Sequence, residues 1–375
     1  MARLVRLFPA LLFTFLLHGC SNAVPKEPIT LSHIYAQTGT GRELGRDAQQ
    51  AVLLAVEEIN ADDKGILGRP LVVREIDTGG NPETAREQTV RLLSLQRSVA
   101  VIAGPDAASA AEVARAAHAY VTTVIVAGEL AEAPRGDGVL VLGADPHKRG
   151  QVLSSYAATE LKAKRVVVLT DKRDPVGKIL ATGFQDAWPR AAPASAEEWA
   201  SADLGAEKDL PKRLTEAKAD VVLVCGSVGD FLKIRSQCTA EKFAVPLMFG
   251  GEDAGIFSIQ ASAAGPDVYL ATIAAPDGVT DKGKAFAKKY EDRFHEAPTL
   301  AAFQAYDSVR LVSEAMQQSN LTSALDLKAR LNRLDKFDSL LGMVTWKEHV
   351  AKRSLFVARL HDKETTIVKT VKADE

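Results

Sequence analysis

The sequence is poor in features that mark several classes of protein. Only three of its 375 residues are cysteine, and none has the paired spacing of a zinc site. Basic and acidic residues nearly balance, at 46 against 48, so the excess positive charge typical of nucleic-acid-binding proteins is missing. The apolar run at 7–17 is too short to span a bilayer as a helix. These features argue against a zinc site, a nucleic-acid partner and a membrane-spanning helix at the start of the chain.

Motifs of common enzymes are missing as well. Neither G-x-S-x-G nor H-E-x-x-H occurs, and His33, His118 and His147 have no metal-ligand spacing. The glycine loop at 39–45 reads G-x-G-x-x-x-G, one residue longer than a dinucleotide fingerprint. We therefore expect no cofactor and no metal. Carboxylates at separate strand ends leave an acid/base pair open as a weaker alternative.

Apolar periodicity predicts alternating strands and helices. Apolar residues recur at spacings of four, three and four from Ala48 to Ile59, as on one face of a helix. The β-branched run at 71–76 is typical of a strand, and Asn81 before Pro82 can cap the next helix. Further strands are expected at 29–36, 99–102, 122–127, 165–169, 221–224, 246–249, 268–273 and 355–360. This alternation predicts parallel sheets, and the length of the chain favours two domains.

The N-terminus has the pattern of an export signal. Two arginines precede the apolar run at 7–17, and the tetrapeptide Leu-His-Gly-Cys at 17–20 resembles a bacterial lipobox. His18 departs from the small or β-branched residue usual at that position. We predict lipid attachment at Cys20; an ordinary secretory leader is the alternative. Cys225 and Cys238 are expected to be two buried thiols, because a βα unit places them too far apart for a disulfide.

A family resemblance rests on the stretch AVEEINADDKGILGRPL at 55–71. It follows the glycine loop at 39–45 and precedes Ile-Ala-Gly-Pro at 102–105. In this combination the chain resembles the branched-chain amino acid (Leu/Ile/Val) binding proteins, which are type I periplasmic solute-binding proteins of ABC transporters. The resemblance covers roughly residues 28–360. It implies an α/β fold of two Rossmann-like lobes, joined by three crossovers, with a ligand cleft between them.

The resemblance also implies a division of the chain. Residues 1–19 would be the signal peptide with its lipobox, and 20–28 a tether. The N-terminal lobe would comprise 29–146 and 275–344, and the C-terminal lobe 147–274 and 345–375. Trp346 would lie near the third crossover.

Most of the family's ligand site does not carry over. Ala108 occupies the position of the serine that holds the ligand carboxylate, with Ser109 one step later. Glu129 and Ala131 replace the short Ala-x-Thr element, and only Glu252 keeps the role of meeting the ligand ammonium. Smaller residues replace the aromatic residues that cover the ligand. The positions at which we expect ligand contact are Leu44, Ala108, Ser109, Glu129, Val176, Ser227 and Glu252.

The charges suggest an altered ligand. Glu129 and Glu252, without a nearby arginine that the sequence identifies, would repel a free carboxylate in a partly dehydrated cleft. We hypothesise a neutral or cationic solute. Simpler interpretations remain open: Glu129 as a solvated loop residue, Glu252 as a turn carboxylate and Ser109 as a helix N-cap. Asp77 is expected to order the loop that follows it.

These observations favour an exported, lipid-anchored and monomeric solute-binding protein of the cell envelope or periplasm. It would close its cleft around a small solute and deliver it to an ABC permease. The alternative is a sensor or structural lipoprotein that keeps the fold but no longer serves transport. An enzyme ranks third.

Overall fold

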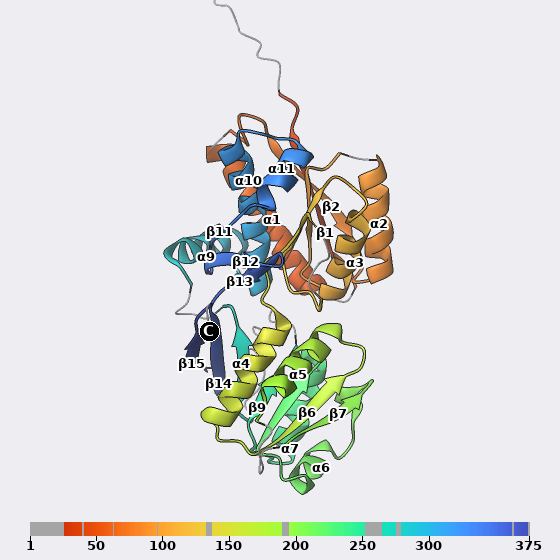
Figure 1. Ribbon diagram of the computed structural model, residues 1–375, viewed down its shortest axis with the longest axis vertical. Helices are drawn as coiled ribbons and strands as arrows, with labels where there is room; N and C mark the ends of the chain where they lie inside the picture. Colours follow the sequence, from red (N-terminus) through yellow and green to blue (C-terminus); the bar gives the residue numbers. More distant parts are fainter. Residues whose placement is uncertain are drawn as a thin grey trace, which may run out of the picture.

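The computed structural model describes residues 26–39, 41–62, 64–95, 97–132, 137–189, 195–251, 265–274, 279–361 and 364–373. The chain forms two lobes that lie one above the other along the long axis of the molecule, as Figure 1 shows. Each lobe is built on one sheet, and each sheet is covered by helices on both faces. None of the described helices has the length and apolar character to cross a membrane.

The first sheet has eight strands in the described part of the chain. In spatial order they are β11 (Lys336–Ser339), β12 (Gly342–Lys347), β13 (Val350–Lys352), β5 (Val139–Val141), β4 (Thr123–Val126), β3 (Ala100–Ala103), β1 (Ile29–Tyr35) and β2 (Leu71–Asp77). Strands β1 to β5 pair in parallel, whereas β11, β12 and β13 pair with one another as antiparallel hairpins. The parallel part is the β/α core that the sequence predicts.

Alternate residues of these strands feed two apolar clusters. Ala100 and Ile102 of β3 belong to one cluster, and Val101 and Ala103 belong to the other. The first cluster is completed by α1 (Arg42–Asp62), α9 (Asp281–Phe294), α10 (Leu300–Ser319) and α11 (Ala324–Leu331). The second is completed by α2 (Pro82–Leu95) and α3 (Ala107–Ala117). Burial of both faces explains why the central strands β3, β4 and β5 are almost wholly apolar.

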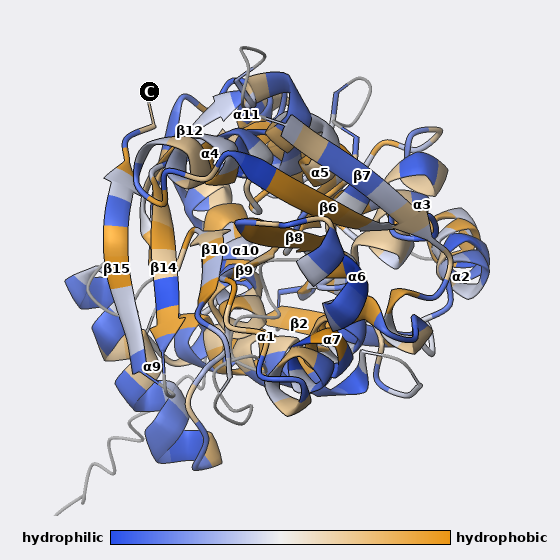
Figure 2. Cartoon of the chain, turned by 90° about the horizontal axis from the view of Figure 1, so that it is seen from below, coloured by the Kyte–Doolittle hydropathy of each residue, from blue (hydrophilic) through white to orange (hydrophobic). Residues whose placement is uncertain are grey.

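The second sheet has seven strands in the described part of the chain. Their order is β15 (Glu364–Val371), β14 (Leu355–His361), β10 (Val268–Thr272), β9 (Leu247–Phe249), β8 (Val221–Cys225), β6 (Arg165–Asp171) and β7 (Ser195–Ser201). Strands β6 to β10 are parallel, and β14 and β15 form an antiparallel edge. Viewed from below, the apolar strands β6 and β8 lie between helices with polar outer sides (Figure 2).

Helices cover this sheet in the same way. Helices α4 (Pro146–Thr159) and α5 (Pro175–Ala187) lie on one face. The other face carries α6 (Leu210–Glu216), α7 (Val228–Ala240) and the short helix η1 (Leu204–Ala206). The apolar cluster under α4 and α5 continues into the cluster under α1 and α10, so one core runs through both lobes.

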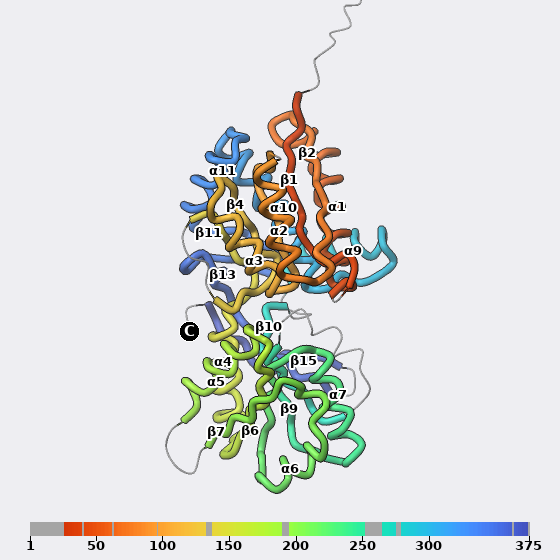
Figure 3. The backbone as a smooth tube through the Cα atoms, turned by 90° about the vertical axis from the view of Figure 1, so that its right-hand side faces the viewer, coloured from red at the N-terminus to blue at the C-terminus, as the bar shows by residue number. Residues whose placement is uncertain are grey.

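Helices α4 and α5 approach each other closely at two glycines. A β-carbon on Gly150 would lie 2.1 Å from the carbonyl oxygen of Leu180, and one on Gly183 would lie 2.0 Å from that of His147. No other residue type fits at either position without moving a backbone. These contacts fix α4 against the second lobe, although α4 directly follows the chain's first crossing between lobes (Figure 3).

The observed elements confirm most sequence predictions and correct several. The strand predicted at 29–36, the helix around Ala48 and the cap at Asn81 are present, the last accepting the Thr84 amide at 3.0 Å. Strand β5, helix α4 and strands β7, β11 to β13 and β15 were not predicted from the sequence. The third crossing lies after Lys352, because Trp346 belongs to β12 of the first sheet. The boundary predicted at 344/345 is therefore too early.

Candidate functional site

The carboxyl ends of the parallel strands in each sheet point toward the other lobe. The chain leaves the first lobe after β5 and leaves the second lobe after β10, at the carboxyl end of a parallel strand in each case. All parallel strands of one sheet end on the same side, so both sets of strand-end loops face the space between the lobes. Open α/β sheets bind ligands at this edge. The site predicted from the sequence lies on these loops.

In the first lobe, Asp77 joins two of these loops. Its carboxylate accepts the amides of Gln37 at 2.8 Å, Thr38 at 3.2 Å and Gly79 at 2.8 Å, and the Thr38 hydroxyl at 2.6 Å. Burial alone would raise the pKa of Asp77, but the hydrogen bonds from Thr38, Gly79 and Gln37 outweigh it and lower the pKa. Asp77 thus orders the glycine loop as well as its own, in agreement with the sequence analysis.

The start of α3 is already capped by a carboxylate. Asp106 accepts the amides of Ala108 and Ser109, each at 3.2 Å. The hypothesis that Ser109 is the N-cap is therefore wrong. Ser109 is 5% exposed and its hydroxyl has no hydrogen-bond partner among the described residues. Ala108 is half-buried in the same turn, and Leu44 is half-buried in the first turn of α1.

The second lobe positions its predicted residues differently. Val176, in the first turn of α5, has no exposed surface, so its side chain packs inside the protein. Asp174 caps that helix by accepting the Gly177 amide at 3.0 Å, and burial raises its pKa despite this bond. Ser227 is exposed and caps α7, accepting the Asp230 amide at 3.1 Å. Glu252 lies outside the described residues.

Glu129 is neither solvated nor far from an arginine. It is 4% exposed, and both of its carboxylate oxygens accept hydrogen bonds from Nη1 of Arg149 at 2.9 Å. Arg149 itself has no exposed surface. The solvated-loop interpretation is therefore wrong, and so is the premise that no arginine lies near. Charge repulsion by Glu129 no longer supports the hypothesis of a non-carboxylate ligand.

Sequence reasoning missed Arg149 altogether. Arg149, Leu153 and Tyr156 recur at spacings of four and three, and all three are buried on α4. A charged residue within an apolar helical stripe is the signal that could have revealed it, because such a residue needs a buried partner. The partner is Glu129, which lies on the other side of the first crossover. No sequence pattern links Glu129 to Arg149.

Ala108 and Ala131, two positions that differ from the family's ligand site, line the same pocket. A pocket of about 740 Å³ is lined by Ala107, Ala108 and Ala111 of α3, by Leu130 and Ala131 beyond β4, and by Pro175 of the second lobe, among others. Its size is that of a small-molecule site. Within the described residues, no group of three acidic, histidine or cysteine side chains could hold a metal ion. Cys225 and Cys238 are free and buried, as predicted.

Comparisons with known proteins give the family. The family model described as periplasmic binding protein matches residues 28–365. A search of curated proteins finds no match.

Solved structures share the fold along almost the whole chain. A branched-chain amino acid transporter substrate-binding protein from Streptococcus pneumoniae, in complex with isoleucine, has a TM-score of 0.79 and 23% identity, covering 92% of this chain and 100% of its own. An ABC transporter solute-binding protein from R. palustris, in complex with benzoate, has a TM-score of 0.76 and 17% identity, covering 92% and 96%. One from Rhodopseudomonas palustris BisB5, in complex with 3,4-dihydroxybenzoic acid, has a TM-score of 0.77 and 18% identity, covering 92% and 98%. The predicted two-lobed fold is confirmed, and the chain belongs to the periplasmic binding protein family.

Proposed function

We propose that this protein captures a small solute between its lobes and delivers it to an ABC permease. The observation that carries the proposal is that the strand-end loops of both lobes face each other, in a chain whose family binds solutes. A solute that contacts both lobes would favour the closed form, and the permease would recognise that form. The function needs no covalent step, so we propose a binding protein rather than an enzyme.

The proposed ligand is neutral or cationic, for a reason that differs from the one the sequence offered. Isoleucine and benzoate, bound by the structural relatives, both carry a carboxylate. A helix N-terminus favours an anion, but at α3 the carboxylate of Asp106 already accepts the amides of Ala108 and Ser109. A solute carboxylate at that turn would meet a like charge instead of free donors. Asp106 thus disfavours the ligands of these relatives.

Thermal unfolding with a panel of solutes tests the proposal. We expect amides, sugars or polyamines to raise the unfolding temperature, and leucine, isoleucine, valine and benzoate to leave it unchanged. A solute at about a hundred times its dissociation constant should add about 2.7 kcal/mol to the free energy of unfolding. A shift with leucine or benzoate would overturn the charge argument but keep the binding function.

Asp106→Ser is the matched variant. Serine keeps a helix cap but removes the negative charge, so carboxylate solutes should bind more tightly while the capped helix survives. Unchanged affinity for carboxylates in a folded Asp106→Ser protein would mean that Asp106 does not select against them. If no solute shifts either protein, the sensor or structural lipoprotein becomes the better interpretation.

The cellular setting belongs to the same proposal. We propose that Cys20 carries a lipid, that residues 20–28 tether the protein to a membrane, and that it acts as a monomer in the periplasm or envelope. We further propose that the two lobes move as units, with the third crossover placed at 353–354 rather than at 344/345.

A further inference from the structure

The side chain of Arg149 forms hydrogen bonds to three segments that are distant from α4 in the sequence. Its Nη1 donates to both oxygens of Glu129 and to the carbonyl oxygen of Gly251, all at 2.9 Å. Its Nε donates to the carbonyl oxygen of Ala271 at 2.7 Å. The side chain has no exposed surface, so these bonds form away from solvent.

The partners of Arg149 come from both lobes and from the segments that join them. Glu129 follows β4 in the first lobe, whereas Arg149 lies in α4 of the second lobe, just after the first crossover. Ala271 belongs to β10, whose end begins the second crossover. Gly251 follows β9 and directly precedes Glu252, the residue that the family resemblance assigns to the ligand. One guanidinium therefore connects the hinge region with the segment that directly follows β9.

The surroundings of Arg149 are tightly constrained. A β-carbon on Gly251 would lie 2.3 Å from the carbonyl oxygen of Gly226, so this loop lies directly against the one that follows β8. A β-carbon on the neighbouring Gly150 would lie 2.1 Å from the carbonyl oxygen of Leu180 in α5. Neither the helix nor the loop can move far without breaking the bonds to Arg149. A buried ion pair resists such separation, because each charge would lose its partner without gaining water.

We propose that Arg149 is the positioning residue of the cleft. Through Glu129 it pins the two lobes together beside the hinge, so that they rotate about this point rather than sliding apart. Through the carbonyl oxygen of Gly251 it holds the end of the segment that follows β9 at a fixed place relative to that pivot. The inference rests on the proposed function only in requiring two lobes that open and close, and it does not depend on which solute binds.

The test measures the distance between the lobes in the exported protein without any solute. Spin labels at Arg91→Cys in α2 and Lys212→Cys in α6 report it in a Cys20→Ser background, since both positions are exposed and the other native thiols, Cys225 and Cys238, are buried. The variant is Glu129→Leu with Arg149→Met, which removes both charges and keeps apolar volume. We expect a folded protein whose distance distribution is broader and includes longer distances. Arg149→Lys should give an intermediate distribution, since it keeps the charge but not the fork of donors.

A matched control separates positioning from ordinary stabilisation. Asp267 pairs with Arg359 at 2.7 Å entirely within the second lobe, so Asp267→Asn should lower the unfolding temperature without changing the distance between lobes. A double variant that folds and keeps the wild-type distance distribution would overturn the proposal. Failure of every solute to bind would count against the proposed function alone, because the distances compared here are those of the unliganded protein.

Discussion

Two buried titratable side chains of the first lobe should give the protein opposite responses to acid. His33 lies in β1, fully buried and stacked on Tyr35 with ring centroids 4.3 Å apart. Burial lowers the pKa of His33 from 6.5 to about 3. Asp307 lies in α10, and burial raises its pKa from 3.8 to about 6. The positive charge of Arg310 and the hydrogen bond from the Leu340 amide lower this pKa but do not outweigh burial. Acid thus disfavours the fold through His33 and favours it through Asp307.

For His33 the folded state prefers the neutral ring. Its contribution to stability is complete above pH 6.5 and is lost as the pH falls from 6.5 toward 3, because the unfolded chain takes up the proton first. The expected loss is on the order of 2 kcal/mol by about pH 5, at ~1.4 kcal/mol per pH unit. His33→Phe keeps the stack on Tyr35 and should remove this part of the pH dependence in denaturant titrations. His118→Gln, at an exposed position, should keep it.

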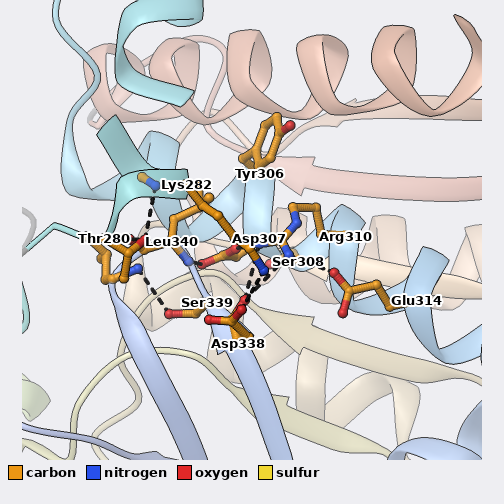
Figure 4. Close-up of polar contacts among 12 residues, drawn as sticks. Thr280, Lys282, Tyr306, Asp307, Ser308, Arg310, Glu314, Asp338, Ser339 and Leu340 are labelled. Atoms are coloured by element: carbon orange, nitrogen blue, oxygen red, sulfur yellow. Dashed lines mark hydrogen bonds and ion pairs between the residues drawn. The ribbon is translucent and has the colours of Figure 1, made fainter. Parts of the chain in front are cut away.

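For Asp307 the sign is reversed. Its carboxylate accepts the Leu340 amide and an Arg310 nitrogen, each at 2.9 Å, and the same Arg310 reaches Glu314 at 2.7 Å (Figure 4). The folded state binds this proton more tightly than the unfolded chain, so stability should fall as the pH rises from about 4 to about 6. Asp307→Asn should abolish that decline in the same titrations. A variant whose curve still runs parallel to that of wild type between these pH values would contradict the prediction.

At the scale of elements, the contact between α4 and α5 depends on glycine. Gly183 lies inside α5, where alanine would ordinarily favour the helix by up to about 1 kcal/mol. Because a β-carbon there would lie 2.0 Å from the His147 carbonyl oxygen, we expect Gly183→Ala to lower the free energy of unfolding by about 1–3 kcal/mol instead.

The control for Gly183 is Gly229→Ala in α7. There the added β-carbon would meet only the Ser227 hydroxyl, at 3.7 Å. Equal effects of the two substitutions in chemical denaturation would mean that the close approach of α4 to α5 carries no energetic weight.

Elements also differ in how far the sequence reveals them. Strands such as β3 and β8 are buried on both faces and are apolar enough to identify from the sequence. Strands β5 and β13 have three residues each, so their state depends on the neighbours they pair with rather than on their own pattern. Because β12 pairs with β13 in a hairpin, Trp346 belongs to the first lobe. The third crossover therefore follows the end of β13, at Lys352.

At the scale of the whole molecule, membrane attachment is the clearest prediction. Cys20→Ser should release the protein from the membrane fraction into the soluble part of the envelope, because one thiol would carry the only predicted anchor. Fractionation followed by mass spectrometry of the N-terminal peptide measures this. A wild-type protein found unmodified at Cys20 would favour the ordinary secretory leader.

The alternation of strands and helices follows from local periodicity, and the family follows from a contiguous motif, so both could be derived from the sequence alone, as could the positions of the strand ends. The contacts that the side chains at those strand ends make depend on the packing of distant segments. Asp106, not Ser109, caps α3, and Glu129 is neutralised by an arginine twenty residues away on the other lobe. Such pairings form only when distant segments are packed together, since burial, rather than sequence spacing, makes a charge require its partner.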